Sequence, residues 1–364
     1  MSDPTDATVS LIAHLLGVLD RLESAERHLH PSAIPVLAAP LGPDHDALAA
    51  ALAGFRAVAW PAPLADFRDQ AVTAAQAALR ACTELTEAAG SPDGLRLAYR
   101  ALRNLPRAAQ ALYPLAGALP TVSAWFLEAN RREDPVLLAR LATAGPDTGI
   151  HHFGNHRGTR GGYSVYVPET YEETTASPLI MALHGGSGHG RHFLWSWLRN
   201  ARSRDMILVS PTSPGATWSI MDPEVDGPHL ARILEIVGRR WHIDPARLLL
   251  TGMSDGGTFT LVSGLQEDSP FTHLAPVAAS FHPLLLTMAE PARVRGLPIY
   301  LLHGALDWMF PISVARTANR ALTAAGANVT YREVADLSHV YPRDETPAIL
   351  DWFARHGRGP SAQT

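Results

Sequence analysis

Short apolar segments alternate with helical segments over the second half of the sequence, beginning at Tyr163. The apolar segments have the length and the β-branched and aromatic content of single strands: YSVYV, PLIMAL, MILVS, RLLLTG, PVAAS, PIYLLHG and VTYREV. Most of them are separated by segments with helical spacing of apolar residues, such as GPHLARILEIVGRRW and ISVARTANRALTAAG. Nearly continuous apolar strands that alternate with helices indicate a parallel sheet covered on both faces. We therefore predict an α/β fold for residues 163–364.

Residues 1–148 show helical periodicity as their strongest pattern. Apolar residues recur at three- and four-residue spacing, and Pro and Gly separate the periodic segments, as in PSAIP and GSPDG. We predict an all-helical N-terminal domain over 1–148 and a linker over 149–162, which is rich in Gly and polar residues. The helical domain is expected to act as a lid, a docking module or a dimerisation surface. A homo-oligomer formed through these helices is therefore one possible partner.

The charged residues exclude several classes of protein. The net charge of −5 and a charged fraction of 18% argue against a nucleic-acid partner and against a disordered chain. The sequence contains no lysine, so all 30 basic side chains are arginines. Arginine stays protonated and cannot replace a lysine that must act as a neutral amine. The absence of lysine excludes Schiff-base enzymes, such as those that use pyridoxal phosphate. It also excludes P-loop nucleotide sites and Ser–Lys dyads, both of which require a lysine.

The expected compartment is the cytoplasm. The single cysteine, Cys82, cannot form an intramolecular disulfide, and its alanine-rich neighbourhood predicts a buried structural thiol. The first residues lack the basic and apolar regions of a signal peptide. No uninterrupted apolar run is long enough for a membrane span, for which about 18 residues are needed.

The segment RLLLTGMSDGGTFTL contains a G-x-S-x-G pattern between a predicted strand and a predicted helix. In that setting the serine lies on a sharp turn that exposes its hydroxyl, and the flanking glycines leave room for the turn. The following helix directs its N-terminal N–H groups toward a developing oxyanion. We therefore predict that Ser254 is a nucleophile.

An acid and a histidine follow in the order that such a nucleophile requires, each after a predicted strand. Asp307 follows PIYLLHG, and His339 follows VTYREV directly before the last predicted helix. Asp336 is the rival acid, but its closeness to His339 in the sequence is expected to turn it toward solvent. We favour Asp307 as the residue that orients the imidazole of His339.

The predicted strand PLIMAL ends in HGGSG, the expected position of an oxyanion-binding loop. We predict that the backbone N–H groups of Gly186 and Asp255 form the oxyanion hole, because glycine lets the chain approach the substrate oxygen closely. Ser187, Trp218 and Trp308 are placed where they would line a substrate pocket. Core packing of the two tryptophans is the alternative.

These segments resemble the α/β-hydrolase fold and, within it, the bacterial phospholipase/carboxylesterase group. The resemblance covers about residues 160–357 and is carried by LHGGSG, DPARLLLTGMSDGGTFTL, LLHGALDWMFP and VTYREVADLSHVYPRDETPAILDWF. It implies a triad of Ser254, Asp307 and His339, carboxylic ester substrates and no cofactor. Two features depart from the group: Ser338 stands where a glycine is common before the histidine, and the helical N-terminal half is additional.

We therefore predict a serine esterase that hydrolyses a small-molecule ester through an acyl-enzyme, with no cofactor. His151, His152 and His156 match no zinc-binding spacing, so no metal site is expected. Thioesterase, polyesterase or peptidase activity on the same triad remains an alternative. A catalytically silent binding or scaffold protein is the alternative from another class.

Overall fold

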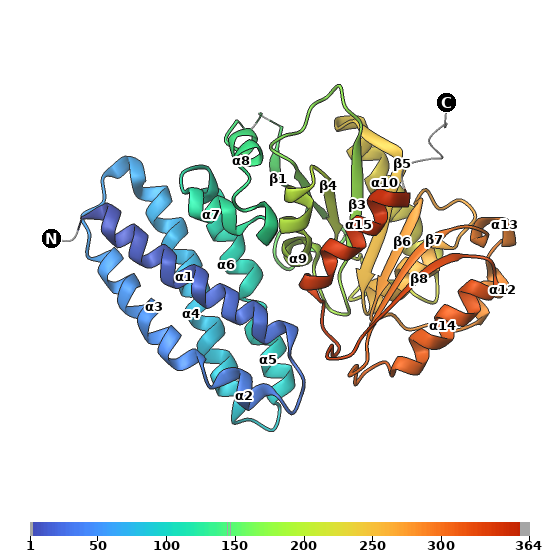
Figure 1. Cartoon of the computed structure of the whole chain (residues 1–364), viewed down its shortest axis with the longest axis horizontal. Helices are drawn as coiled ribbons and strands as arrows, with labels where there is room; N and C mark the ends of the chain where they lie inside the picture. Colours follow the sequence, from blue (N-terminus) through green and yellow to red (C-terminus); the bar gives the residue numbers. More distant parts are fainter. Residues whose placement is uncertain (1–2, 144, 146, 357–364) are drawn as a thin grey trace. The chain divides into compact units, whose positions relative to one another are not determined.

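The computed structural model describes residues 3–143, 145 and 147–356 (Figure 1). It divides into two compact units, Met1–Asp134 and Pro135–Thr364. The segment 357–364 of the predicted catalytic domain, and residues 1, 2, 144 and 146 of the predicted helical domain, lie outside the described residues.

The described residues of the first unit form helices joined by turns, which agrees with the helical region expected from the sequence. The α-helices are α1 (Pro4–Arg27), α2 (Ile34–Ala38), α3 (Leu41–Arg56), α4 (Ala65–Ala89), α5 (Gly94–Leu102), α6 (Leu105–Leu112) and α7 (Pro120–Trp125). The 3-10 helices are η1 (Ala62–Leu64), η2 (Tyr113–Gly117) and η3 (Ala129–Arg131).

Helix α4 is the centre of this unit, because α1, α3, α5 and α6 all pack against it. Its buried face consists mostly of alanines, whose small side chains let the neighbouring helices come close. Cys82 lies on this face and is 1% exposed, as the sequence predicted. Burial raises the pKa of its thiol to about 12, so the unreactive thiol form dominates at neutral pH.

The second unit begins with helix α8 (Pro135–Leu141) and is built on one sheet, which has eight strands within the described residues. The strands are β1 (Gly149–Phe153), β2 (Tyr163–Val167), β3 (Ser177–Leu183), β4 (Ile207–Pro211), β5 (Ile243–Met253), β6 (His273–Val277), β7 (Pro298–Gly304) and β8 (Asn328–Val334). Their order is β1-β2-β4-β3-β5-β6-β7-β8. From β4 to β8 all neighbours are parallel, whereas β2 is antiparallel to both β1 and β4.

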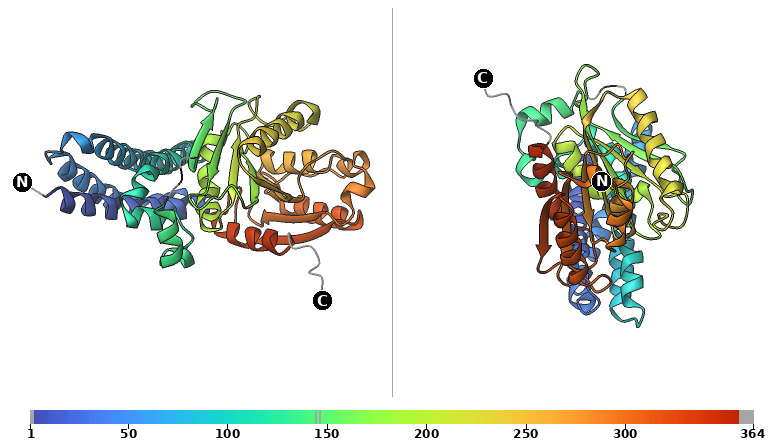
Figure 2. Two further views of the ribbon diagram at one scale, coloured as in Figure 1. Left: turned by 90° about the horizontal axis from the view of Figure 1, so that it is seen from above. Right: turned by 90° about the vertical axis from the view of Figure 1, so that its right-hand side faces the viewer.

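Helices cover both faces of the sheet, which confirms the predicted α/β fold. Helices α9 (Gly190–Ser203) and α15 (Thr346–His356) contact each other over one face. On the other face, α10 (Pro223–Arg240), α11 (Asp255–Gly264) and α14 (Ile312–Ala324) form a core with alternate strand residues such as Leu179 and Met181. Figure 2 shows α10 and α15 on opposite sides of the sheet.

The remaining short helices, α12 (Leu284–Met288), α13 (Pro291–Val294) and η4 (Arg343–Glu345), lie in connections. Among the described residues, no helix combines the length and the hydropathy that crossing a bilayer requires.

Two details differ from the sequence-based expectation. The predicted linker 149–162 contains β1, a half-buried edge strand whose GIHHF sequence lacks the apolar run of a central strand. Phe153 anchors this strand by stacking on Tyr163, with 4.9 Å between the ring centroids. The strand predicted at PVAAS instead ends at Val277, because Ala278 has a positive φ of 48° that takes the chain out of the extended conformation.

Candidate active site

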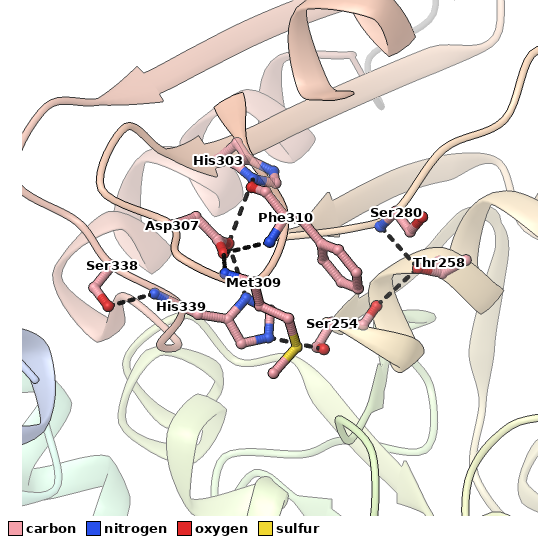
Figure 3. Close-up of polar contacts among 9 residues, drawn as sticks. All are labelled: Ser254, Thr258, Ser280, His303, Asp307, Met309, Phe310, Ser338 and His339. Carbon is pink, nitrogen blue, oxygen red and sulfur yellow. Dashed lines mark hydrogen bonds and ion pairs between the residues drawn. The ribbon is translucent and has the colours of Figure 1, made fainter. Parts of the chain in front are cut away.

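The predicted nucleophile, acid and histidine lie in loops that follow three parallel strands. Ser254 follows β5, Asp307 follows β7 and His339 follows β8. Because parallel strands end at the same edge of a sheet, the topology brings these three loops together, as it does in other open α/β sheets. Figure 3 shows the three side chains pointing toward one another.

Ser254 lies on a strained turn between β5 and α11, with φ 56° and ψ −119°. This positive φ is rare for a residue with a side chain and marks a functional constraint. The two flanking glycines explain the sequence motif. A Cβ on Gly252 would lie 2.4 Å from backbone atoms of Gly256, and a Cβ on Gly256 would lie 2.4 Å from the carbonyl oxygen of Leu183.

Backbone hydrogen bonds hold the turn in this conformation. The Ser254 N–H donates to the carbonyl of Val277 at the end of β6 (3.0 Å). The Ser254 carbonyl accepts from the backbone N–H (2.8 Å) and the hydroxyl (3.1 Å) of Thr258. The Thr258 hydroxyl oxygen also accepts from the Ser280 N–H (2.9 Å), which ties α11 to the loop after β6. These contacts fix the position from which the Ser254 hydroxyl projects.

The three predicted side chains form a continuous series of hydrogen bonds. The Ser254 hydroxyl lies 2.9 Å from His339 Nε2, and His339 Nδ1 lies 2.8 Å from Asp307 Oδ2. Because a carboxylate is an acceptor only, Nδ1 carries the imidazole proton, and Nε2 is left to accept from the serine. All three residues are buried, with exposed fractions of 7% for Ser254, 6% for Asp307 and 4% for His339.

Both oxygens of the Asp307 carboxylate accept hydrogen bonds. Its Oδ1 accepts from the backbone N–H groups of Met309 (2.9 Å) and Phe310 (2.8 Å), and its Oδ2 faces His339. Burial by itself raises the pKa of this carboxyl group, but the hydrogen bonds from His339 and Phe310 outweigh burial and lower it. Asp307 is therefore ionised at neutral pH and available to orient an imidazole.

The structure shows which of the two candidate acids contacts His339. Asp336 is exposed, whereas Asp307 holds the imidazole. Ser338, which stands where the resembling group often has glycine, accepts a hydrogen bond from the His339 N–H at its hydroxyl oxygen (2.6 Å). The serine side chain thus contributes to the position of the histidine.

The loop after β3 lies beside the nucleophile, as predicted. A Cβ on Gly185 would come within 3.5 Å of the Ser254 Cβ, and a Cβ on Gly186 would come within 2.7 Å of Asp255 Oδ2. The Asp255 carboxylate accepts a hydrogen bond from the Thr217 hydroxyl (2.6 Å). Gly186 and Asp255, whose N–H groups are the predicted oxyanion hole, are therefore neighbours, and the role of these N–H groups stays a prediction.

His184 holds this loop, and the sequence analysis did not assign it a role. Its Nδ1 donates to the Gly185 carbonyl (2.7 Å), and its Nε2 accepts from the Ser213 N–H (3.1 Å). Burial lowers its pKa to about 3, so the ring is neutral. A neutral ring with one donor and one acceptor matches both partners. Its position just before the glycines was the available signal.

Arg160 is a second residue that the sequence analysis left without a role. Its guanidinium donates to the carbonyls of Gly188 (2.7 Å), Gly215 (2.8 Å) and Ser213 (3.0 Å). It therefore ties the end of the glycine-rich loop to the loop after β4. No local pattern marks an arginine whose partners are backbone carbonyls, so its contacts are visible only in the fold.

The three predicted pocket residues have different environments. Trp308 is 40% exposed, and its ring lies 6.0 Å from that of His339, so it borders the site. Ser187 is exposed and has a positive φ of 54°. Trp218 has the environment of the core-packing alternative: its ring is 2% exposed, stacks on Phe259 at 5.6 Å and donates from Nε1 to the His184 carbonyl. Trp218 packs beneath the loop instead of lining an open pocket.

The described part of the chain contains no group of three or more His, Cys, Asp or Glu side chains placed to hold a metal ion. His151 and His152 lie in β1, where His152 Nδ1 is 2.8 Å from the Ser164 hydroxyl.

A family model described as phospholipase/carboxylesterase matches residues 229–356. This segment contains Ser254, Asp307 and His339, and it ends at the last residue of α15. The match confirms the resemblance to α/β-hydrolase esterases that the sequence motifs indicated.

Among curated proteins, a bifunctional acetylxylan esterase/xylanase from Neocallimastix patriciarum is 25% identical over 162 residues, which are 43% of this chain and 23% of that protein. The chain thus spans about a quarter of the length of this relative. Among solved structures, a thermostable esterase has a TM-score of 0.44 at 20% identity, covering 56% of this chain and 62% of its own. Arabidopsis thaliana SOBER1 has a TM-score of 0.43 at 17% identity, covering 50% of this chain and 100% of its own.

Proposed function

We propose that this chain, whose second unit is an α/β-hydrolase with a phospholipase/carboxylesterase segment, hydrolyses carboxylic esters through a covalent acyl-enzyme. One observation carries the proposal: a strained, glycine-flanked Ser254 hydroxyl lies 2.9 Å from a histidine that is itself held by a buried carboxylate. A hydroxyl, an imidazole and a carboxylate in this order are the parts of a serine nucleophile and its general base.

In the first half of the reaction, Ser254 Oγ attacks the ester carbonyl while His339 Nε2 takes the hydroxyl proton. The resulting imidazolium is stabilised by the Asp307 carboxylate. When the tetrahedral intermediate collapses, the carbon–oxygen bond to the alcohol breaks, and His339 returns the proton to the leaving alkoxide. In the second half, water replaces the alcohol, and the same groups release the acid and restore Ser254.

The oxyanion of each tetrahedral intermediate needs donors that are already in place. We assign this role to the N–H groups of Gly186 and Asp255, each expected to contribute about 3–4 kcal/mol to the transition state. Support comes from the close approach of Gly186 to Asp255 and from the contacts of His184 and Arg160, which hold the loop on either side of Gly186.

The test compares Ser254→Ala with Ser280→Ala, a serine whose backbone also lies at this edge of the sheet. Ester hydrolysis is measured with p-nitrophenyl acetate, and thermal unfolding is recorded for both variants. Ser254→Ala should lose several orders of magnitude in kcat without a loss of folding, and Ser280→Ala should remain close to wild type. Wild-type turnover by Ser254→Ala would refute the proposal.

The class of ester is tested with a side-by-side panel. Acetyl esters of carbohydrates belong in it, because the curated relative is an acetylxylan esterase/xylanase. Long-chain esters, thioesters, polyesters and peptides cover the alternatives on the same triad. Quantitative attachment of a fluorophosphonate to Ser254 supports an enzyme, whereas failure to attach favours a binding or scaffold protein.

The proposed role of the helical unit is access to the site, docking or dimerisation. Light scattering of the full chain tests dimerisation, and a monomer at all accessible concentrations would exclude it. Comparison of chain-length preference with and without residues 1–148 tests the role in access, provided that the shortened chain stays folded.

A further inference from the structure

A second buried histidine, His303, contacts the acid of the series and has no part in the mechanism described above. It lies near the end of β7 and is 0% exposed. Its Nε2 lies 2.8 Å from the Phe310 carbonyl oxygen and 3.4 Å from Asp307 Oδ2. Figure 3 shows His303 and His339 reaching Asp307 and its loop from different sides.

The contacts define the protonation state of His303. Because both groups near Nε2 are acceptors, Nε2 carries a proton and donates to the Phe310 carbonyl. Nδ1 is buried and has no hydrogen-bond partner in the described part of the chain. A proton there would be a buried donor without an acceptor, which is costly. Burial lowers the pKa of His303, although the Phe310 carbonyl and Asp307 act in the opposite direction. The ring is therefore neutral.

The Phe310 carbonyl belongs to the same short loop whose N–H groups hold Asp307. Met309 and Phe310 donate to Oδ1, and this leaves Oδ2 directed toward His339. A donor that fixes the Phe310 peptide therefore fixes the carboxylate as well. The same Nε2 proton lies near Oδ2 and adds positive potential on that oxygen.

We propose that His303 is a positioning residue for Asp307. Its Nε2–H fixes the loop Asp307–Phe310 and so keeps Oδ2 directed toward His339. The same proton makes the carboxylate less basic. This inference rests on the proposed function, because it assigns His303 a task within the same hydrolytic site. No charge on His303 is involved, since the neutral ring supplies the donor.

Besides Asp307, the charged or titratable groups that act on His303 are Glu333 and His339. Glu333 pairs with it across the β7–β8 ladder, but the Glu333 carboxylate forms an ion pair with Arg316. His339, on the loop after β8, also acts on the ring and favours its neutral form, whereas Asp307 and Glu333 act in the opposite direction. The loss of the Nε2 donor is therefore expected to be felt first at Asp307.

The test uses His303→Gln, His303→Asn and His303→Leu in the full chain. A glutamine amide reaches about as far as Nε2 and keeps a donor there, whereas the shorter asparagine amide and the leucine side chain do not. Without the donor, Asp307 becomes more basic and binds the imidazolium of His339 more strongly. The acid limb of kcat/KM should therefore move to higher pH by about half a unit or more in the Asn and Leu variants. The Gln variant should keep the wild-type limb.

A purely structural role would lower activity or stability without moving this limb. An unmoved limb in the Asn and Leu variants, or an equal shift in the Gln variant, would overturn the proposal. If the Leu variant does not fold, the Asn and Gln pair decides the outcome. The low-field proton resonance of His339 Nδ1–H, absent in a His339→Gln variant, reports the same titration without any substrate. The resonance tests the role of His303 even if the protein does not hydrolyse esters, so the two proposals can fail independently.

Discussion

Replacing Asp307 by asparagine separates the hydrogen-bonding role of this side chain from its shape. An amide has one acceptor and one donor end, whereas the carboxylate of Asp307 accepts at both oxygens. At Oδ1 it accepts from the backbone N–H groups of Met309 and Phe310, which cannot change their protonation. At Oδ2 it faces Nδ1 of His339, which can change tautomer. The amide oxygen is therefore expected on the backbone side and the amide NH2 on the histidine side.

This arrangement forces His339 into the wrong tautomer. With a donor opposite Nδ1, the imidazole proton moves to Nε2, where it points at the Ser254 hydroxyl 2.9 Å away. The histidine can then no longer accept the serine proton. An exchange of this kind in a Ser–His–Asp triad lowers kcat by about 10⁴-fold, which corresponds to about 5 kcal/mol of transition-state stabilisation.

The assay is the pH dependence of kcat for p-nitrophenyl acetate, with thermal unfolding to show that Asp307→Asn remains folded. Asp336→Asn is the matched control, because Asp336 is the rival acid and is exposed. It should keep near wild-type activity. An Asp307→Asn enzyme within ten-fold of wild type at neutral pH, or a large loss in Asp336→Asn, would show that Asp307 does not set the tautomer of His339.

Three further predictions concern stability and reactivity. Gly256→Ala should destabilise the protein by about 1–3 kcal/mol or more in denaturant unfolding, because its Cβ would lie 2.4 Å from the Leu183 carbonyl oxygen. Gly227→Ala, with open space around its Cβ, should not destabilise the protein, and equal losses would contradict the steric argument. Cys82, whose pKa is raised to about 12, should resist a thiol reagent in the native state and react once the chain is unfolded; rapid native labelling would show that α4 opens. The pKa values of His184 (about 3) and His273 (about 4) lie below the usual 6.5, so the unfolded chain takes up more protons and Tm should fall between about pH 6.5 and 4; a flat Tm in this range would contradict their burial.

The sequence predicted the fold of the second unit because its central strands are buried on both faces. Strands such as β3 and β7 read as continuous apolar runs, and helical periodicity between them is unambiguous. The edge strand β1 was missed because one neighbour and partial exposure permit the polar sequence GIHHF. The misplaced end of β6 depends on the positive φ of Ala278, and alanine gives no signal for such a conformation.

The site was predictable where the chemistry depends on chain position and not where it depends on contacts across the fold. Ser254, Asp307 and His339 follow strands, so topology alone brings them together. The environment of Trp218 could not be predicted, because a tryptophan after a strand is compatible with either a pocket or a core. His303 lies within an apolar strand, where nothing in the local pattern distinguishes a buried neutral donor from core packing.

A stoichiometric covalent label tests most directly whether Ser254 is an activated nucleophile. The native full chain is treated with a fluorophosphonate, and intact-mass and peptide mass spectra are recorded for wild type, Ser254→Ala and His339→Gln. We expect one adduct per chain on the peptide that contains Ser254, no adduct in the alanine variant, and much slower labelling in the glutamine variant. Labelling at another residue, or the same labelling rate without His339, would contradict it.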